Sequence, residues 1–217
     1  MKKIIASLFA FVLVFAFAVL GFSGCTNASF EDPVISETNI VTEEQWDSSM
    51  SLFWKNLTFE YTYKDNGVSK TQKLELLADG SLHQSGQGWG EKFVKYSNSK
   101  WKVYGEGGVP TSMEYSTEED YIDGNYGDDI GFMSAILPKL EGEFDEFTYN
   151  ETTKEYVAEN YYFIVYGTEG YNVNITAKFE GGNLTKISFG FGYEEADFEV
   201  IFYDYGTTTI DFPESIS

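Results

Sequence analysis

The sequence is 217 residues long and strongly acidic, with 35 acidic and 14 basic residues and a formal net charge of −21 at pH 7. Every basic residue is a lysine, so the chain lacks the arginine forks that usually grip phosphates and base edges. Because there is no basic patch either, nucleic acid is excluded as a partner, and anionic lipid headgroups would repel the protein. Aromatic residues make up 18% of the chain and glycines number 21, a composition typical of β-strands joined by tight turns.

The chain begins with a segment typical of exported proteins. Two lysines precede an apolar run at residues 4–22, and the small residues Ser23 and Gly24 stand directly before Cys25. Cys25 is the only cysteine, so it cannot form a disulfide within the chain. Its role therefore depends on the chemical reactivity of its thiol. This arrangement resembles the lipidation site of bacterial lipoproteins, in which the cysteine becomes the N-terminus and carries a diacylglycerol thioether.

The resemblance implies a signal peptide at residues 1–24, lipid attachment at Cys25 and a location on the outer face of the cell membrane. Two acyl chains give a stable anchor, since each buried methylene contributes about 0.8 kcal/mol. An uncleaved signal anchor and a secretory signal cleaved near Gly24 stay open as alternatives. The polar stretch that follows has no helical or strand period, so residues 25–41 are predicted to be a flexible tether, about 50 Å long at full extension.

A single β-rich domain is expected to span residues 42–213 and to begin with an amphipathic helix. Thr42 and Gln45 form a capping box, in which the Thr42 hydroxyl accepts from the Gln45 amide while the Gln45 side chain reaches back. The apolar stripe of this helix consists of Trp46, Met50, Phe53 and Trp54. We expect the helix to end near Asn56.

The first hairpin can be assigned a register from the sequence. Asn66 and Gly67 suit a two-residue type I′ turn, because both residues tolerate a positive φ. Counting outward from this turn gives the pairs Phe59 with Leu74, Leu57 with Leu76, Glu60 with Lys73, and Thr62 with Thr71. Apolar side chains then face apolar ones and opposite charges meet, which supports this register.

Two further tight turns follow. A turn at residues 79–80 (DG) leads into a strand at residues 81–85 and places His83 opposite Leu76, near the end of an apolar face. A third hairpin is predicted around residues 98–99 (NS). Its expected pairs are Tyr96 with Trp101 and Val94 with Val103.

The second half of the chain returns to strands after an interruption. Residues 105–129 are rich in glycine and then in acids, and residues 130–140 predict a short helix that Pro138 interrupts or ends. Strands are predicted at residues 144–149, 155–159, 161–166, 171–180, 184–193 and 198–205. Leu184 pairs with Phe179 across a two-glycine turn but is out of phase with Ile187, so a bulge is expected between Leu184 and Ile187.

This order of elements predicts a mainly β (α+β) fold. We expect a curved antiparallel sheet or incomplete β-barrel, with the N-terminal helix and a short mid-chain helix covering one face.

Several short segments resemble clostridial-type lipoproteins. They are VTEEQW at 41–46 through LTF at 57–59, FTYN at 147–150 with KEY at 154–156, and VIFYDYGT at 200–207 with Ile210 and Pro213. That group is similar to the LolA-like and LppX-like half-barrel of lipoprotein and lipid carriers, and the resemblance covers about residues 42–213. It implies a curved sheet and helices that enclose an apolar cavity for acyl chains, with no catalytic signature.

The chain offers few residues for catalysis. A serine or cysteine nucleophile needs an adjacent base, and the chain has a single histidine, His83, and one cysteine that is assigned to the lipid. A structural or rim position is therefore the favoured interpretation of His83. A zinc site would require several histidine and cysteine ligands, and the sequence has only one of each, so zinc is excluded. A glycosidase-like pair of carboxylates is the remaining enzymatic alternative. Because the sequence does not single out such a pair, we expect neither enzymatic activity nor a cofactor.

One acidic segment is a candidate for calcium. Its oxygen ligands would be Asp123, Asn125, Asp128 and Asp129. Their spacing fails the EF-hand pattern, because Asp128 stands where that loop requires glycine. A solvated acidic loop is the favoured interpretation of the same residues.

The surplus of aromatic residues has two interpretations. Rings at strand spacing can fill a β core, or they can line a slot that an open half-barrel leaves for an apolar ligand. We therefore predict an exported, lipid-anchored protein that binds a hydrophobic or lipidic ligand without catalysis. The alternative is a surface interaction or structural lipoprotein that binds a protein or a cell-wall polymer through exposed tyrosines and acids.

Overall fold

The computed structural model describes residues 39–65, 67–87, 90–126, 130, 133, 136–164, 170–191 and 198–216 of the chain. Cys25, the predicted signal peptide and most of the predicted tether lie outside these residues, as do Asp128 and Asp129. No helix within the described ranges is both long and apolar enough to cross a membrane.

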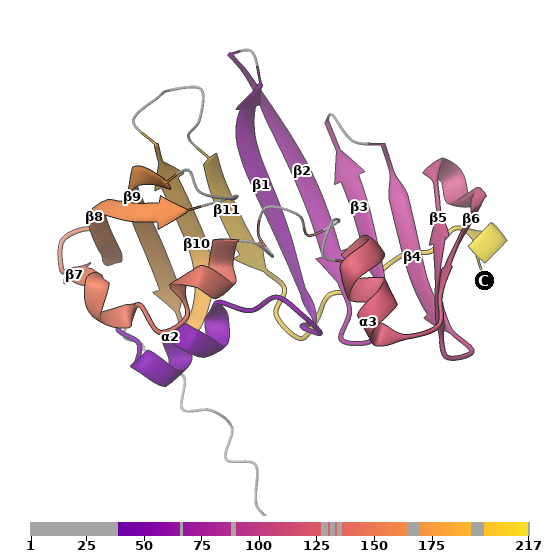
Figure 1. Cartoon of the computed structure of the whole chain (residues 1–217), viewed down its shortest axis with the longest axis horizontal. Coiled ribbons are helices and arrows are strands. Elements are labelled where there is room, and N and C mark those ends of the chain that lie inside the picture. The colour runs from indigo at the N-terminus through magenta and orange to yellow at the C-terminus, as the bar shows by residue number, and fades with distance from the viewer. Residues whose placement is uncertain are drawn as a thin grey trace, which may run out of the picture. The chain divides into compact units, whose positions relative to one another are not determined.

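The described strands form one open, antiparallel, curved sheet (Figure 1), as the sequence predicts. The first six strands are β1 (Leu57–Asp65), β2 (Val68–Leu76), β3 (Leu82–Gly86), β4 (Lys92–Ser97), β5 (Lys100–Tyr104) and β6 (Pro110–Tyr115). The other five are β7 (Thr148–Asn150), β8 (Glu155–Ile164), β9 (Gly170–Glu180), β10 (Asn183–Gly190) and β11 (Phe198–Tyr203). Their spatial order is β6-β5-β4-β3-β2-β1-β11-β10-β9-β8-β7, so the β1–β11 pair joins two meanders, and β6 and β7 are the edges.

Short helices cover one face of this sheet, which we call the inner face. They are α2 (Glu43–Ser49), α3 (Glu118–Tyr121) with a π-turn η2 (Ile122–Tyr126), and the 3-10 turns η3 (Leu137–Leu140) and η4 (Phe144–Glu146). Rings connect them to the sheet: Trp46 of α2 lies 5.5 Å from Phe179, and Tyr121 of α3 lies 4.8 Å from Trp101. Both contacts are at the same end of the strands, which we call the helix end, and the β1–β2 hairpin extends furthest toward the opposite end (Figure 1).

The capping box of α2 is confirmed, but the predicted length of the helix is wrong. The Gln45 amide donates to the Thr42 hydroxyl at 3.2 Å, and the Thr42 amide donates to the Gln45 side chain at 2.9 Å. The helix ends at Ser49 instead of near Asn56. Trp54 then adopts a positive φ of 58° and stacks on Tyr126 at 5.2 Å. The predicted stripe is thus divided, because Trp46 and Trp54 pack on different halves of the sheet.

The first and third hairpins have the predicted registers. Each predicted pair of the first hairpin is present, and the hydroxyls of Thr62 and Thr71 lie 2.9 Å apart. In the third hairpin Tyr96 pairs with Trp101 and Val94 with Val103. Its turn residues, Asn98 and Ser99, have φ values of 53° and 60°, as a type I′ turn requires.

The predicted position of His83 is wrong by one residue. Leu76 pairs with Leu82, and His83 pairs with Glu75. The turn between them is one residue longer than the two-residue turn assumed from the sequence, and Gly80 in it has a φ of +81°. Because side chains alternate along a strand, the shift moves His83 to the outer face of the sheet.

In the second half, the predicted bulge is present between Leu184 and Lys186. The segments predicted as two strands at 155–159 and 161–166 form the single strand β8, with an irregularity at Asn160, whose φ is 53°. The predicted strand at 144–149 is wrong in its first half, where η4 precedes β7. Within the predicted helix at 130–140, the described turn η3 has Pro138 in its first turn. The edge strand β6 and helix α3 have no counterpart in the prediction.

The C-terminal segment crosses the outer face of the first meander (Figure 1). Phe212 lies 6.2 Å from Phe93 of β4, and the Lys95 ammonium donates to the Ile216 carbonyl at 3.0 Å. The Ser215 hydroxyl donates to the Gly108 carbonyl at 3.3 Å. These contacts cover part of the outer face.

Candidate functional site

Aromatic side chains gather on the inner face toward the end away from α2 and α3, which we call the far end, and one of them, Tyr161, borders η4, where its ring lies 6.2 Å from Phe147. They come from five neighbouring strands or their ends: Tyr61 and Tyr63 of β1, Phe198 of β11, Phe191 after β10, Tyr171 of β9 and Tyr161 of β8. We call these six residues the aromatic surface. Five of them are half-buried and Tyr171 is 42% exposed, although the neighbouring inner-face residues toward the helix end are buried.

The rings of the aromatic surface pack against one another along the sheet. Phe198 stacks on the buried ring of Phe189 at 4.6 Å and lies 5.9 Å from Phe191. Phe191 in turn meets Tyr171 edge to face at 6.2 Å, and Tyr61 stacks on Tyr63 at 5.7 Å. Such ring pairs hold each other in place, so the surface is a preformed apolar platform.

Two glutamines interrupt the apolar inner face, one on β2 next to Tyr61 and one on β3. Gln72 of β2 is 1% exposed and pairs with Tyr61, and Gln84 of β3 is 2% exposed and pairs with Leu74. The Tyr61 hydroxyl donates to the Gln72 side-chain carbonyl. The Gln72 side-chain nitrogen, Nε2, has no hydrogen-bond partner among the described residues.

The tyrosine hydroxyls at the edges of the aromatic surface are uncharged hydrogen-bond donors. Burial, and to a lesser degree the neighbouring Tyr63, raises the pKa of Tyr61 to about 12, so its hydroxyl keeps its proton at neutral pH. At the other side of the aromatic surface, burial and the nearby carboxylate of Glu143 raise the pKa of Tyr161 to about 12 as well. The far end therefore carries aromatic rings and two protonated hydroxyls that already have partners, Gln72 for Tyr61 and Glu143 for Tyr161. The buried Gln72 amide nitrogen has no partner among the described residues.

Neither Gln72 nor Gln84 is among the site residues predicted from the sequence. A signal for Gln72 was present, because the predicted register of the first hairpin puts it opposite Tyr61 on the apolar face. A polar residue in that position is unusual, since buried polar groups need partners. Its burial and its missing partner are visible only in three dimensions.

The candidate calcium ligands are not brought together within the described residues. Asp123 is exposed next to α3, Asp128 and Asp129 lie outside the described residues, and the Asn125 side chain is not described. No group of three or more histidine, cysteine, aspartate or glutamate side chains placed to hold a metal occurs in the described part of the chain. The calcium site remains a prediction.

His83 contacts carboxylates and a ring on the outer face. Its Nδ1 lies 2.7 Å from Glu75, its Nε2 lies 3.4 Å from Glu91, and its ring stacks on Phe93 at 4.3 Å. Burial alone would raise the pKa of Glu75, but hydrogen bonds from Lys73 and His83 outweigh it and leave that pKa below its ordinary value. These contacts join β2, β3 and β4, which is a structural role.

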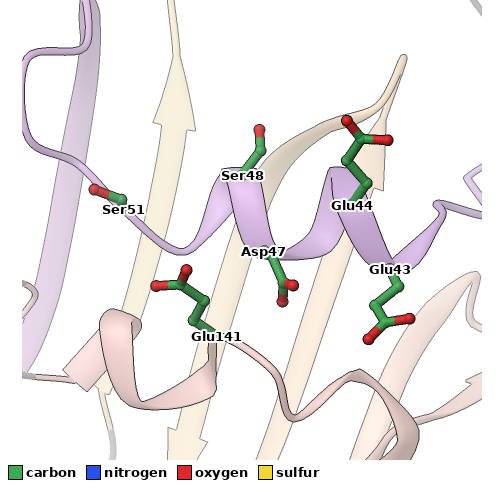
Figure 2. A pocket seen from close by; sticks show the side chains of 6 residues that line it. All are labelled: Glu43, Glu44, Asp47, Ser48, Ser51 and Glu141. Carbon is green, nitrogen blue, oxygen red and sulfur yellow. The ribbon is translucent and has the colours of Figure 1, made fainter. Parts of the chain in front are cut away.

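A hollow of about 550 Å³ lies beside α2 on the protein surface. It is lined by Glu43, Glu44, Asp47, Ser48, Ser51 and Glu141 (Figure 2). Its four carboxylates come from α2 and from the end of η3, and no basic residue lines it. Asp47 already accepts from the Gly142 amide at 2.8 Å, so this residue holds α2 to the chain after η3.

A second hollow, of about 490 Å³, lies on the outer face over β9, β10 and β11. Most of the polar side chains that line it are already paired. Lys178 lies 2.7 Å from Glu180, and the Tyr203 hydroxyl donates to Glu60 at 2.7 Å. The Tyr205 hydroxyl donates to the Leu184 carbonyl at 2.6 Å. This hollow therefore offers a ligand less unsatisfied chemistry than the far end of the inner face.

Comparison with models of known protein families gives no match, and a search of curated proteins finds no relative. The resemblance to half-barrel lipoprotein and lipid carriers therefore stays a prediction.

Proposed function

We propose that the protein is an exported, lipid-anchored lipoprotein that binds a hydrophobic or lipidic ligand, without catalysis, on the aromatic surface. The observation that carries this proposal is the row of half-buried rings across β1, β11, β10, β9 and β8. Contiguous apolar surface on a soluble domain is unfavourable unless something covers it, and such patches commonly mark binding sites.

The architecture explains how the rings stay partly exposed. The sheet is open, with β6 and β7 as its edges, so its inner face is not closed by a barrel. The helix end of that face is filled by large side chains such as Trp46, Tyr121 and Tyr126, which are fully buried. Among the described residues, the part of the inner face left for an acyl chain is the far end, where the rings are half-buried. The resemblance to lipid carriers supports the same assignment.

Photo-crosslinking tests this proposal with the full-length protein in its own membranes. A palmitic acid analogue that carries a diazirine on its chain is added, irradiated, and mapped by peptide mass spectrometry. We expect crosslinks on peptides from β1 and β8–β11. The variant Phe198→Asp is expected to reduce these crosslinks about tenfold, because it places a charge among the rings.

The matched control is Ile201→Asp on the same strand. Ile201 is 44% exposed on the outer face, so this variant adds the same charge outside the proposed site and should keep wild-type crosslinking. Crosslinks restricted to the N-terminal segment would contradict ligand binding. Strong crosslinks on the acidic surface near α2 would instead favour the alternative of a surface interaction protein.

The anchor gives a separate prediction. Cys25→Ser is expected to release the protein from the membrane fraction into the medium, because a serine cannot carry the thioether-linked lipid. A protein with a net charge of −21 has no other strong attraction to anionic lipid. Fractionation by ultracentrifugation, with labelling by a palmitate analogue, measures both effects, and Ser23→Ala serves as the lipidated control. A Cys25→Ser protein that stays in the membrane would favour an uncleaved anchor.

A further inference from the structure

We infer that the ligand is an anionic amphiphile, with its acyl chain on the aromatic surface and its negatively charged headgroup, a carboxylate or a phosphate, at Lys70 of β2. This inference rests on the proposed function, since it names the class of ligand that the same site would take. The observation behind it is a lysine that the fold places on the apolar inner face, directly beside the rings.

Lys70 lies on the inner face because side chains alternate along β2. Gln72, Leu74 and Leu76 are buried on this face, and Lys70 continues their alternation as a half-buried side chain. The other charged side chains that the structure describes on β1, β2, β9, β10 and β11 alternate onto the outer face. A cation among apolar side chains attracts an anion more strongly than the same cation in water.

A row of paired residues leads from Lys70 onto the aromatic surface. Lys70 pairs with Tyr63 of β1, and Tyr63 pairs with Phe198 of β11. Phe191, 5.9 Å from Phe198, and then Tyr171 continue the rings toward β9. Neighbouring strands lie about 4.8 Å apart, so β2 is about 10 Å from the strand that carries Phe198. A chain that lies on these rings can therefore end at Lys70.

The charges at the two ends of the aromatic surface set the direction of the ligand. At the β8 end, Tyr161 lies beside the carboxylate of Glu143 and near that of Glu146, and these would repel an anion. At the β2 end, Lys70 would attract one. The net charge of −21 does not decide the matter, because salt screens charges beyond about 8–10 Å at physiological ionic strength. The headgroup is therefore expected at β2 and the end of the chain toward β8.

The inner face is long enough for such a ligand. From β2 to β8 the sheet has five strand-to-strand steps, which is about 24 Å across the strands. The hydrocarbon core of a bilayer is about 30 Å thick, so the acyl chain of one leaflet spans about 15 Å, which leaves room for a headgroup. The Lys70 ammonium has three N–H donors, so it can hold the anion and keep its interaction within the chain.

Competition in the crosslinking experiment measures the preference for an anionic headgroup. The full-length protein in membranes is crosslinked with an alkyl diazirine that has no headgroup, and lysophosphatidylglycerol, palmitic acid or monopalmitoylglycerol is added as competitor. Monopalmitoylglycerol supplies an acyl chain and a glycerol without a charge. The preference is the ratio of the monopalmitoylglycerol concentration to the anion concentration that halves crosslinking at β1 and β8–β11. Comparing this ratio between variants cancels the partition of each competitor into the membrane.

The variant Lys70→Gln removes the charge and keeps a polar side chain. We expect its preference for the anion to be about fivefold lower than that of the wild type, the upper range for a partly exposed ion pair. The competitor whose preference falls more identifies the headgroup, a phosphate for lysophosphatidylglycerol or a carboxylate for palmitic acid. Lys70→Arg keeps the charge and should keep the preference. Lys70→Met, which keeps the apolar stem, is the second variant if Lys70→Gln folds poorly.

Lys64→Gln is the matched control. Lys64 belongs to the same hairpin but is exposed on the outer face, so this variant makes the same change in net charge away from the rings. It should keep the wild-type preference.

The outcomes separate the two proposals. A preference that is unchanged in Lys70→Gln, or that falls equally in Lys64→Gln, would overturn the role of Lys70 while leaving ligand binding on the rings intact. If none of the competitors reduces crosslinking at β1 and β8–β11, the proposed function itself fails.

Discussion

Replacing Trp46 with alanine is expected to lower the free energy of unfolding by about 3–5 kcal/mol, the largest loss expected of any single substitution in α2. Trp46 is 0% exposed, and its ring lies 4.4 Å from Phe147, 5.6 Å from Tyr156 and 5.5 Å from Phe179. The indole N–H also donates to the Leu140 carbonyl at 2.9 Å. Alanine would leave a cavity between α2, the turns after η3 and the second meander, and a buried carbonyl without its donor.

Chemical unfolding followed by far-ultraviolet circular dichroism measures this loss. Trp46→Phe is the matched control, because it keeps a ring in the same place and removes the indole N–H. We expect its loss to be about half or less of that of Trp46→Ala. An alanine variant that unfolds at the wild-type denaturant concentration would contradict the position of Trp46 in the core.

Local patterns predicted much of the fold. The register of the first hairpin follows from a turn whose residues both tolerate positive φ, so the pair of Phe59 and Leu74 could be counted from the sequence. The capping box of Thr42 and Gln45 involves groups three residues apart, and the bulge after Leu184 follows from a break in alternation. Each of these features is determined by neighbours in the sequence.

Features that depend on distant contacts could not be predicted. The helix α2 ends at Ser49, and Trp54 packs on Tyr126, which lies more than seventy residues further along the chain. The edge strand β6 is exposed at nearly every position, so its sequence has no apolar alternation to reveal it. The offset of His83 arose from one extra residue in a turn.

The candidate site was predicted only in part. Alternation along β9 and β10 placed Tyr171 and Phe191 on the face that carries the apolar core. The strand order that brings both beside Phe198 and Tyr61 depends on the pairing of β1 with β11, which lie at opposite ends of the domain sequence. No local signal reports such a pairing, so the aromatic surface emerges only from the assembled sheet.

The turn between β2 and β3 gives the second large effect. Gly80→Ala is expected to lower the free energy of unfolding by about 2–5 kcal/mol. Gly80 has a φ of +81°, where an L-residue costs about 1–2 kcal/mol. A Cβ there would also lie 2.3 Å from the Cζ3 atom of Trp54 and 2.8 Å from the Trp101 Nε1. Overpacking of this kind typically adds about 1–3 kcal/mol.

Neither tryptophan near Gly80 can move aside without breaking other contacts. The Trp101 indole donates to the Asp79 carbonyl at 2.9 Å. Trp54 stacks on Tyr126 and donates to Glu118 at 3.1 Å. The clash would therefore spread from the turn into α3, which separates this substitution from a change that strains only the local backbone.

Gly67→Ala is the matched control. Gly67 also has a positive φ, +76°, and nothing lies within 4 Å of a Cβ built there, so this variant has the backbone strain without the clash. Chemical unfolding of both variants, with tryptophan fluorescence as the probe, should show the larger loss and an altered emission spectrum for Gly80→Ala. Because the two glycines share the same strain, the difference between the losses measures the packing of Trp54 over the turn. Equal losses with unchanged emission would mean that Trp54 does not lie over this turn.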